Sequence, residues 1–431
     1  MTLLGKQAPG LVVRDCYPAF LDLVVGDDPD PRFAILGTPG IGKSFFSVYL
    51  LWWLAHSGAS VVFKPAGAPS DQTYHRYLLR PGGKCTTGAP GDFTDVLADP
   101  AAWYILDAHE PERLGLRART VLLTSPREEV YEEWTKQVDA LVRFMPVWTE
   151  DEMHRCHATF GARLGLTVGS LNWRYALVGG NARLLFSPRP DDEMLEKINR
   201  AINKTNLDAC LAAVSGQPSG DKTTGRLVHI VPTNGYRGCR YTFASPAVAR
   251  LLSRTFAAKE RAKVLAFLHA ADGMGEYATL RGFLFEALAH EALARGDTLP
   301  LRAADAAWDG VTVLSLGRRT IVQYSALREV DLSAPSSYYR PVAGNQAAVD
   351  SIAGPGYFFQ CTVSGHHPIK AARFREVLNG VGFGGGVPDI YFVVPQSLFD
   401  SFSVQPFVGV DGHQLTTFPA VRQWVLAFSD A

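Results

Sequence analysis

The chain has 431 residues, of which 47% are apolar and 19% charged, and its formal net charge is zero. This length exceeds the usual size of one hydrophobic core, so we expect a globular protein of two or three domains. The neutral charge balance does not indicate a strongly basic nucleic-acid binder, although it is compatible with a local basic face. The six cysteines are scattered without metal-ligand spacing, which argues against a zinc site and a disulfide framework.

The N-terminal sequence does not indicate a secretory signal, because its apolar stretch is too short. The most apolar segment, residues 45–55, is too short to cross a bilayer. Scattered cysteines are typical of reduced thiols inside a cell. We therefore expect an intracellular protein without a membrane partner.

The segment 37–44 carries the clearest chemical signal. It reads Gly37, Thr38, Pro39, Gly40, Ile41, Gly42, Lys43 and Ser44, which matches G-x-x-x-x-G-K-[ST]. An apolar run precedes it and an apolar helical run follows it, so the context is strand, glycine loop and helix, as a phosphate-binding loop requires. Its amides would bind phosphate at a helix N-terminus, while Lys43 reaches the β and γ phosphates and Ser44 ligates Mg²⁺. The alternative is a chance glycine turn before a helix.

Residues 103–107 form an apolar run that ends in Asp107, which we expect to hold the Mg²⁺ as the second acidic strand of a phosphate-loop protein. The alternative is an aspartate that begins a loop after a buried strand. Glu110 is the candidate for orienting the hydrolytic water, but two residues separate it from Asp107. Residues 203–206 lack the aspartate of a guanine-reading N-K-x-D motif, so the expected nucleotide is ATP rather than GTP.

Residues 61–63 and 120–125 complete the strands of an expected doubly wound α/β core. Thr124 lies at the carboxyl end of the second run, where a parallel sheet faces its ligand, and is a candidate to sense the γ-phosphate. A helix cap after this strand is the equally good alternative. Arg183 follows Gly179 and Gly180 and resembles the second sensor arginine of AAA-type ATPases; otherwise it is a surface residue.

The chain divides into three expected parts. Residues 1–150 form the P-loop NTPase core, and residues 151–215, which begin with a capping box, form a helical lid. The polar, glycine-rich stretch 216–225 is the best linker. Residues 226–431 begin with a short hairpin and two helices, continue mainly as strands, and are expected to form an α/β domain.

This second half has the order of elements found in restriction-endonuclease-like nucleases. Such enzymes use a helix glutamate, an aspartate at a strand start and an acidic-x-Lys on the next strand to hold Mg²⁺ and water near a phosphate. The matching candidates are Glu286, Asp350 and Gln360, with Asp350 and Gln360 as metal ligands. Gln360 replaces the acid and Thr362 replaces the lysine, so Lys370 is the candidate for the positive charge. The alternative for Glu286 is a solvent-facing helix residue.

Several motifs recur together in the Crinkler and retrotransposon hot spot family of eukaryotes, which this chain resembles over nearly its whole length. They are residues 12–17, 37–46, 103–107, 124–126, 145–149, 179–183, 285–287, 359–364 and 367–370. The phosphate loop is common to many ATPases, whereas the Gln-x-Thr-Val-Ser and His-Pro-Ile-Lys pair is more specific to the family.

The resemblance implies an ATPase of the STAND/AAA kind joined to a restriction-endonuclease-like domain. Many family members are secreted effectors that act in a host nucleus, which implies DNA, a host or nuclear protein, or a second copy of the chain as partners. The sequence does not show the secretion header of the effector members, so we expect an intracellular, nuclear protein, with a secreted effector as the alternative. We expect an ATP-driven switch coupled to a Mg²⁺-dependent nuclease that acts on DNA. The alternatives are an ATP-dependent signalling scaffold and a DNA- or protein-binding module with an inactive nuclease fold.

Overall fold

The fold was analysed in a computed structural model of the chain. It describes residues 2–3, 6–7, 10–26, 32–66, 76–109, 116–126, 128–216, 224–305, 310–342, 348–415 and 420–428. These residues form two compact units, Met1–Val248 and Ala249–Ala431. None of the helices in the described segments is long and apolar enough to cross a membrane.

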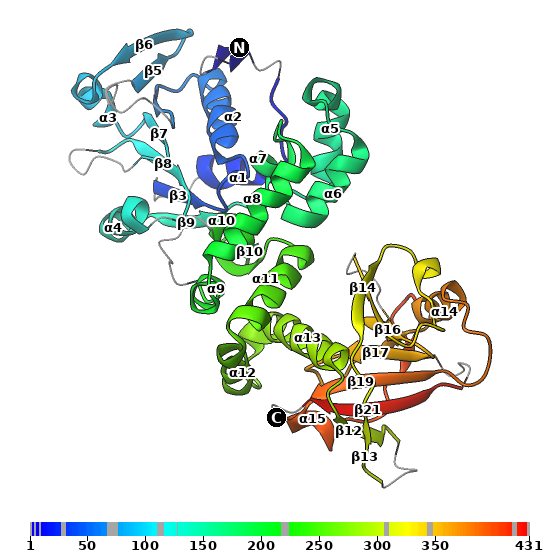
Figure 1. Ribbon diagram of the computed structural model, residues 1–431. Helices are drawn as coiled ribbons and strands as arrows, with labels where there is room; N and C mark the ends of the chain where they lie inside the picture. Colours follow the sequence, from blue (N-terminus) through cyan, green and yellow to red (C-terminus); the bar gives the residue numbers. More distant parts are fainter. Residues whose placement is uncertain are drawn as a thin grey trace. The chain divides into compact units, whose positions relative to one another are not determined.

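The first unit is built on a seven-stranded sheet with the order β6-β5-β4-β7-β8-β3-β9 (Figure 1). Its strands are β3 (Arg32–Leu36), β4 (Val61–Lys64), β5 (Arg76–Arg80), β6 (Lys84–Gly88), β7 (Trp103–Asp107), β8 (Arg119–Thr124) and β9 (Leu141–Phe144). The five strands from β4 to β9 along this order are parallel, and β5 and β6 extend the sheet as antiparallel strands. The mixed α/β architecture expected from the sequence is therefore present.

Alternating side chains of these strands build two cores, one on each face of the sheet. Phe33 and Ile35 of β3 belong to the core that includes Phe46 of α2, whereas Ala34 belongs to the core that includes Trp134 of α4. The helices of this part are α1 (Cys16–Val25), α2 (Lys43–His56), α3 (Thr94–Leu97), α4 (Glu128–Val138) and the 3₁₀ turn η1 (Pro90–Phe93). Helices on both faces make this a doubly wound sheet.

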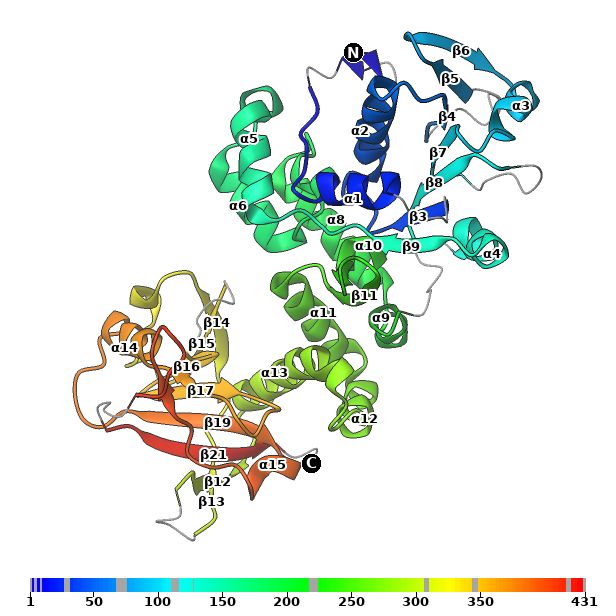
Figure 2. The same ribbon diagram turned by 180° about the vertical axis from the view of Figure 1, so that it is seen from behind.

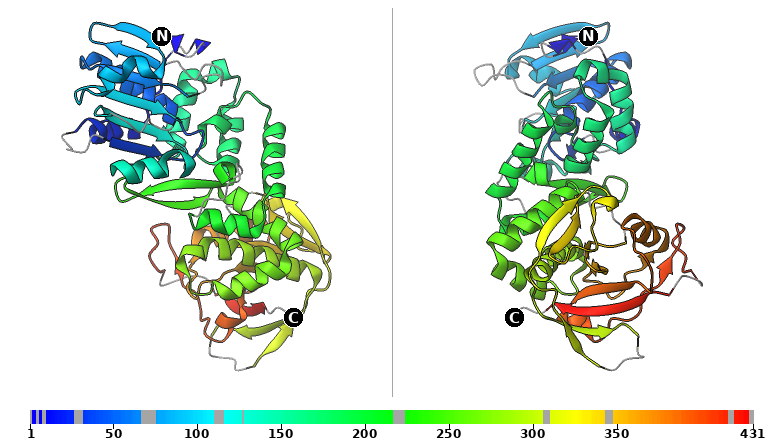
Figure 3. Two further views of the ribbon diagram at one scale, coloured as in Figure 1. Left: turned by 90° about the vertical axis from the view of Figure 1, so that its left-hand side faces the viewer. Right: turned by 45° about the vertical axis from the view of Figure 1, so that its right-hand side comes forward.

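A mostly helical segment follows the sheet and appears in blue-green and green in Figures 2 and 3. It contains α5 (Glu150–Leu164), α6 (Val168–Val178), α7 (Ala182–Leu185), α8 (Asp191–Lys204), α9 (Leu207–Val214) and α10 (Thr224–Leu227). The capping box predicted at its start is present, since the Thr149 side chain accepts from the Glu152 amide and Glu152 accepts from the Thr149 amide. A short pair of strands, β1 (Thr2–Leu3) and β2 (Lys6–Gln7), lies near the start of the chain.

The predicted hairpin is also present, as β10 (Val228–Thr233) and β11 (Gly238–Phe243), but it belongs to the first unit. Tyr236 in its turn accepts a hydrogen bond from the amide of Phe144 at the end of β9. The amide of Ile230 donates to Thr38 Oγ1 over 2.9 Å. The second compact unit therefore begins at Ala249 rather than at the expected residue 226, because tertiary contacts attach the hairpin to the seven-stranded sheet.

The second unit is built on an eight-stranded sheet with the order β13-β12-β21-β19-β17-β16-β15-β14. Its strands are β12 (Leu299–Ala303), β13 (Thr312–Leu314), β14 (Thr320–Tyr324), β15 (Ser337–Pro341), β16 (Ser351–Ala353), β17 (Tyr357–Cys361), β19 (Asp389–Pro395) and β21 (Arg422–Phe428). Strand β16 runs antiparallel to both of its neighbours, β15 and β17, whereas β17, β19 and β21 are parallel. A separate parallel pair is formed by β18 (Ile369–Lys370) and β20 (Phe407–Val408).

Helices cover both faces of this sheet. The helical elements are α11 (Pro246–Lys259), α12 (Arg261–Ala270), η2 (Gly275–Tyr277), α13 (Ala278–Arg295), η3 (Leu327–Glu329), α14 (Ala371–Gly380) and α15 (Gln396–Phe399). Phe374 of α14 packs edge-on against Phe358 of β17 at a ring distance of 6.0 Å. On the other face, His290 of α13 lies 5.8 Å from the ring of Tyr338 on β15. Phe358 and Tyr338 therefore point to helices on opposite faces of the sheet.

Candidate functional site

The phosphate loop connects β3 to α2, as predicted. Gly40 and Gly42 have φ values of 89° and 105°, in the left-handed region that favours glycine. A Cβ atom on Gly40 would lie 2.6 Å from Asn181 Oδ1 and 2.9 Å from Arg183 Cβ. The loop therefore requires glycine at this position both for its backbone conformation and for the close approach of the helical segment.

Lys43 is the first residue of α2, and its side chain turns back into the loop. Its Nζ donates hydrogen bonds to the carbonyl oxygens of Gly37 and Thr38, over 2.7 and 3.0 Å. Burial lowers the pKa of Lys43 to about 7, and the negative charge of Asp107 opposes this effect. The ammonium group thus lies inside the curve of the loop, where its proton is weakly held.

Asp107 ends β7 and is 5% exposed. Its carboxylate is hydrogen-bonded by the Ser44 side chain. Burial raises the pKa of Asp107, while the Ser44 hydrogen bond and the charge of Lys43 oppose the rise. The two predicted Mg²⁺ ligands therefore meet, and a hydroxyl beside a carboxylate is a donor set that suits Mg²⁺.

Thr124 ends β8, which lies between β3 and β7 in the sheet. The register pairs Leu36 with Thr124 and Asp107 with Leu123, so the carboxyl ends of the three strands are level. Thr124 therefore lies at the sheet edge between the phosphate loop and Asp107, as a γ-phosphate sensor requires. Glu110, the predicted water-orienting residue, lies outside the described residues.

The Gly179–Arg183 segment packs directly on the loop. The Asn181 side-chain amide donates to the carbonyl oxygen of Pro39 over 3.0 Å, and the Arg183 amide donates to that of Gly40 over 3.0 Å. A Cβ on Gly180 would lie 2.1 Å from the carbonyl oxygen of Trp148, so only glycine fits there. The structure thus places Arg183 beside the loop, with its side chain exposed.

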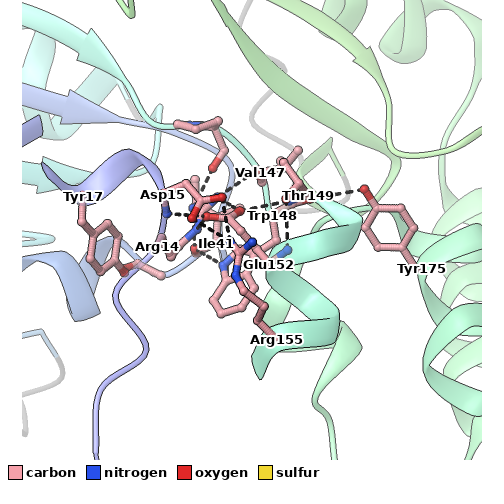
Figure 4. A network of polar contacts seen from close by, with 12 residues as sticks. Arg14, Asp15, Tyr17, Ile41, Val147, Trp148, Thr149, Glu152, Arg155 and Tyr175 are labelled. Carbon is pink, nitrogen blue, oxygen red and sulfur yellow. Dashed lines mark hydrogen bonds and ion pairs between the residues drawn. The ribbon is translucent and has the colours of Figure 1, made fainter. Parts of the chain in front are cut away.

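Arg14, which the sequence analysis did not select, is the centre of a buried network behind the loop (Figure 4). Arg14 and Glu152 are 1% and 3% exposed and form an ion pair at 2.8 Å. Arg14 also donates to the carbonyl oxygens of Ile41, Pro146 and Val147, over 3.3, 2.8 and 2.9 Å. The network therefore joins the start of the chain, the loop and α5.

Two aromatic side chains support the loop from the same side (Figure 4). Trp148 Nε1 donates to the carbonyl oxygen of Ile41 over 2.8 Å, and the Tyr17 hydroxyl donates to that of Gly42 over 3.0 Å. The Arg14 guanidinium lies 5.2 Å from the centre of the Trp148 ring. The capping box around Glu152 is visible in the sequence, and Arg14 lies in the 12–17 motif of the family resemblance. Their contact could not be predicted, because it joins distant parts of the chain.

In the second unit, the structure brings Glu286 of α13 and Asp350, just before β16, to one small pocket. The pocket is lined by Arg250, Arg254, Glu286, Arg340, Pro341, Val349 and Asp350. Three arginines from α11 and β15 therefore surround the two predicted carboxylates. The sequence analysis did not select these arginines, because they are far from the carboxylates along the chain.

The two carboxylates have different environments. Burial and the negative charge of Glu286 raise the pKa of Asp350 to about 8, although its carboxylate accepts a 2.7 Å hydrogen bond from the Cys361 amide. Burial alone would raise the pKa of Glu286, but the neighbouring His290 ring and the charges of Arg250 and Arg340 lower it. Glu286 is therefore the charged carboxylate of the pair near neutral pH, and Asp350 holds a proton more strongly.

His290 connects Glu286 to the sheet. Its Nε2 lies 3.5 Å from Glu286 Oε1, and its Nδ1 lies 2.7 Å from the Tyr338 hydroxyl, which in turn lies 2.6 Å from Ser351 Oγ. Burial, with the charge of Arg340, lowers the pKa of His290 to about 4, so the ring is neutral near pH 7. A chain of polar contacts therefore runs beneath the pocket.

Gln360 does not join Glu286 at this pocket. Its side chain lies 2.9 Å from His367 Nε2, and the alternation of β17 places it with Phe358 on the α14 face, opposite Phe359. Lys370 is exposed on β18, outside the main sheet. The structure therefore separates Gln360 and Lys370 from the two acids, unlike the site that the sequence predicts.

Among the described residues, no group of three or more His, Cys, Asp or Glu side chains lies together as a metal site. The pocket around Asp350 offers two carboxylates and three guanidinium groups, and Gln360 faces away from it. Mg²⁺ prefers several oxygen ligands and is repelled by positive neighbours. The residues of the second unit therefore do not fit the Mg²⁺ that the sequence predicts at Asp350 and Gln360.

No protein-family model matches the chain. Crinkler effector protein 15 of Phytophthora infestans is 26% identical over 405 residues, which cover 91% of this chain and 64% of that protein. Crinkler effector protein 16 of the same organism is also 26% identical over 405 residues, with 91% and 63% covered. The chain thus spans a little under two thirds of these relatives. Their similarity supports the resemblance to the Crinkler family.

A solved structure of Hsp104 in a closed state, with ATPγS and FITC-casein, aligns with a TM-score of 0.29 and 9% identity. The alignment covers 89% of this chain and 64% of that one. A TM-score this low does not show a shared fold.

Proposed function

We propose that the first unit binds ATP with Mg²⁺ and acts as a nucleotide-driven switch. The observation that carries this proposal is the meeting of Lys43, Ser44 and Asp107 at one edge of the parallel sheet. A glycine loop at a helix N-terminus, a lysine inside it and a hydroxyl–carboxylate pair beside it are the groups that a nucleoside triphosphate with Mg²⁺ requires.

Each group has a distinct task in this proposal. The amides of the loop and of the first turn of α2 hold the phosphates, and Lys43 neutralises charge on the β and γ phosphates. Ser44 and Asp107 would hold Mg²⁺, which supplies further charge neutralisation. Thr124 and Arg183 would contact the γ-phosphate, so that hydrolysis changes the interaction of the helical segment with the loop.

A covalent route leads from the loop toward the second unit. The hairpin β10–β11 contacts the loop through the 2.9 Å hydrogen bond from Ile230 to Thr38, and α11 begins three residues after β11 ends, at Pro246. Ser245 caps the start of α11, because its hydroxyl oxygen accepts from the Val248 amide over 3.1 Å. We propose that movement of the loop reaches α11 through this hairpin.

We propose that the second unit is a nucleic-acid-directed domain with DNA as its partner. The succession α13, antiparallel β15–β16–β17, α14 and parallel β19 supports a restriction-endonuclease-like arrangement. Two candidate activities follow. Cleavage of DNA would use Glu286 and Asp350, whereas the separation of Gln360 from these acids favours a module that binds DNA without cutting it.

The similarity to Crinkler effector proteins supports a role as an effector directed at a host cell. We propose that the protein works inside cells, at nuclear DNA or a nuclear protein, and that a second copy of the chain is a further partner when ATP is bound. Light scattering with and without ATP tests the last point, because an ATP-dependent scaffold would increase in mass.

The deciding experiment for the switch is ATP binding to the full chain, measured by calorimetry with Mg²⁺. Lys43→Ala should abolish binding, because it removes the positive charge inside the loop. Lys136→Ala is the matched control, since Lys136 is 71% exposed and pairs with Glu132 on α4. Tight ATP binding that survives Lys43→Ala would overturn the proposal for the first unit.

Plasmid degradation with Mg²⁺, with and without ATP, separates the two candidate activities of the second unit. If it is a nuclease, Asp350→Ala should abolish cleavage, and dependence on ATP would show that the units are coupled. DNA binding without cleavage under every condition would support the binding module.

A further inference from the structure

The pocket of the second unit contains more positive than negative groups. Arg250 and Arg254 come from α11 and Arg340 from β15, and they face Glu286 and Asp350. Arg340 is 7% exposed, and Arg250 and Arg254 are half-buried. Burying three guanidinium groups together is costly unless a negative group compensates them.

The two carboxylates compensate these charges only in part. Arg340 Nη2 lies 3.7 Å from Glu286 Oε1, which is longer than a hydrogen bond, and Glu286 is shared with His290. The Asp350 carboxylate accepts from the Cys361 amide, so it too is shared with another donor. Two shared carboxylates therefore face three guanidinium groups in this pocket.

Two donors in this cluster have no acceptor within the described part of the chain. The Nε atoms of Arg254 and Arg340 are buried and make no hydrogen bond there. A buried donor without an acceptor destabilises the fold, and more so when the group is charged. The Arg250 guanidinium is fixed against the Phe283 ring at 5.6 Å, so the cluster has a defined position beside α13.

We propose that Arg250, Arg254 and Arg340 bind a backbone phosphate of DNA directly, without a divalent cation. The inference rests on the proposed function of the second unit as a DNA-directed domain, and it specifies how that unit holds its ligand. A phosphate supplies the missing negative charge and several acceptor oxygens, which suit the planar fork of an arginine. A cation in the same pocket would meet three guanidinium groups and only two carboxylates.

The experiment is fluorescence anisotropy of a short fluorescein-labelled DNA duplex with the full chain, without nucleotide, in EDTA and in Mg²⁺. DNA is the probe because free phosphate would also bind the phosphate loop. We expect binding in EDTA that Mg²⁺ does not strengthen. The double variant Arg254→Gln/Arg340→Gln should weaken binding at least about tenfold and reduce its salt dependence.

Arg373→Gln is the matched control, since Arg373 is 60% exposed on α14 and pairs with Glu376. The control should bind DNA like the wild type. If the double variant does not fold, as judged by its melting curve, the single variant Arg254→Gln gives the same test, because Arg254 is half-buried rather than buried.

Three results would overturn the inference, and they differ in what they leave standing. DNA binding that requires Mg²⁺, or that is equally tight in the arginine variants, rejects the arginine site but leaves the DNA-directed role. Failure of the wild type to bind the duplex in either buffer rejects both.

Discussion

The backbone amide of Arg183 donates a 3.0 Å hydrogen bond to the carbonyl oxygen of Gly40. This contact places α7 against the phosphate loop, and Asn181 reinforces it through its bond to Pro39. Because the loop has little room for another atom at Gly40, a rearrangement of the loop must also move this segment. Under the proposed function, this contact would let the helical segment respond to a bound nucleotide.

Arg183→Ala is expected to lower the rate of ATP hydrolysis about 10–100-fold while ATP binding changes less, because the arginine would stabilise charge that develops on the γ-phosphate. Phosphate release measures the rate. Arg189→Ala is the control, as Arg189 is 61% exposed and pairs with Glu193. Unchanged turnover in Arg183→Ala would mean that its side chain is only a surface group.

ATP binding should take up a proton and weaken with rising pH. Burial lowers the pKa of Lys43 to about 7, with the charge of Arg183 adding to this effect and that of Asp107 opposing it. Above this pH the amine is largely neutral and must gain a proton to pair with phosphate, so the Kd should rise by up to about tenfold per pH unit.

Calorimetry in buffers of different ionisation enthalpy measures this proton uptake directly. The same titration with Lys136→Ala should give the wild-type result, since that lysine is largely exposed on α4. Binding enthalpies that are identical in all buffers, with tight binding above pH 8, would contradict a buried lysine that titrates near neutrality.

Glu152→Ala is expected to destabilise the first unit by about 3–5 kcal/mol, because it leaves the buried charge of Arg14 without its partner. Arg155→Ala removes an ion pair with Asp15 whose side chains are 55% and 66% exposed, so it should destabilise the unit far less than Glu152→Ala does. Urea unfolding of both variants makes the comparison. An equal decrease in the free energy of unfolding in both variants would show that the Arg14–Glu152 pair does not stabilise the fold.

The stability of the second unit should fall as pH rises toward 8. Burial, with the charge of Glu286, raises the pKa of Asp350 to about 8, whereas an unfolded aspartate has a pKa of about 3.9. Between these values the folded state keeps a proton that the unfolded state releases, so the free energy of unfolding declines by up to about 1.4 kcal/mol per pH unit.

Asp350→Asn should remove this decline and raise the melting temperature relative to the wild type near pH 8. Its amide oxygen can still accept from the Cys361 amide, so the local backbone bond remains available. Melting curves between about pH 5 and pH 8 measure the effect, with exposed Asp411→Asn as the control. A variant that retains the wild-type slope would assign the pH dependence to another group.

The phosphate loop could be predicted because its chemistry is contiguous: the strand, glycines, lysine and helix lie within one short segment. Asp107 and Thr124 could be placed because strand ends in a parallel sheet share one edge. Their roles remain predictions, although the structure brings both to the loop. Glu286 and Asp350 line one pocket, while their roles in a nuclease stay a prediction.

The parts that the sequence did not predict depend on contacts between distant segments. Gln360 was expected beside Asp350, but the face of β17 to which it points depends on which helix covers that face. The hairpin was recognised, yet only its hydrogen bonds to Thr38 and Phe144 assign it to the first unit. No local sequence pattern indicates the face of Gln360 or the unit to which the hairpin belongs.

The sequence by itself determined the glycine loop between β3 and α2, the buried strand that ends in Asp107 and the α/β class, because short-range spacing dictates these features. Only the tertiary structure decided that Arg14 and Glu152 brace the loop and that three arginines surround Glu286 and Asp350. Both arrangements of buried charges have the same physical reason. A buried charge must find its partner in space, and that partner can come from any part of the chain that packing brings near.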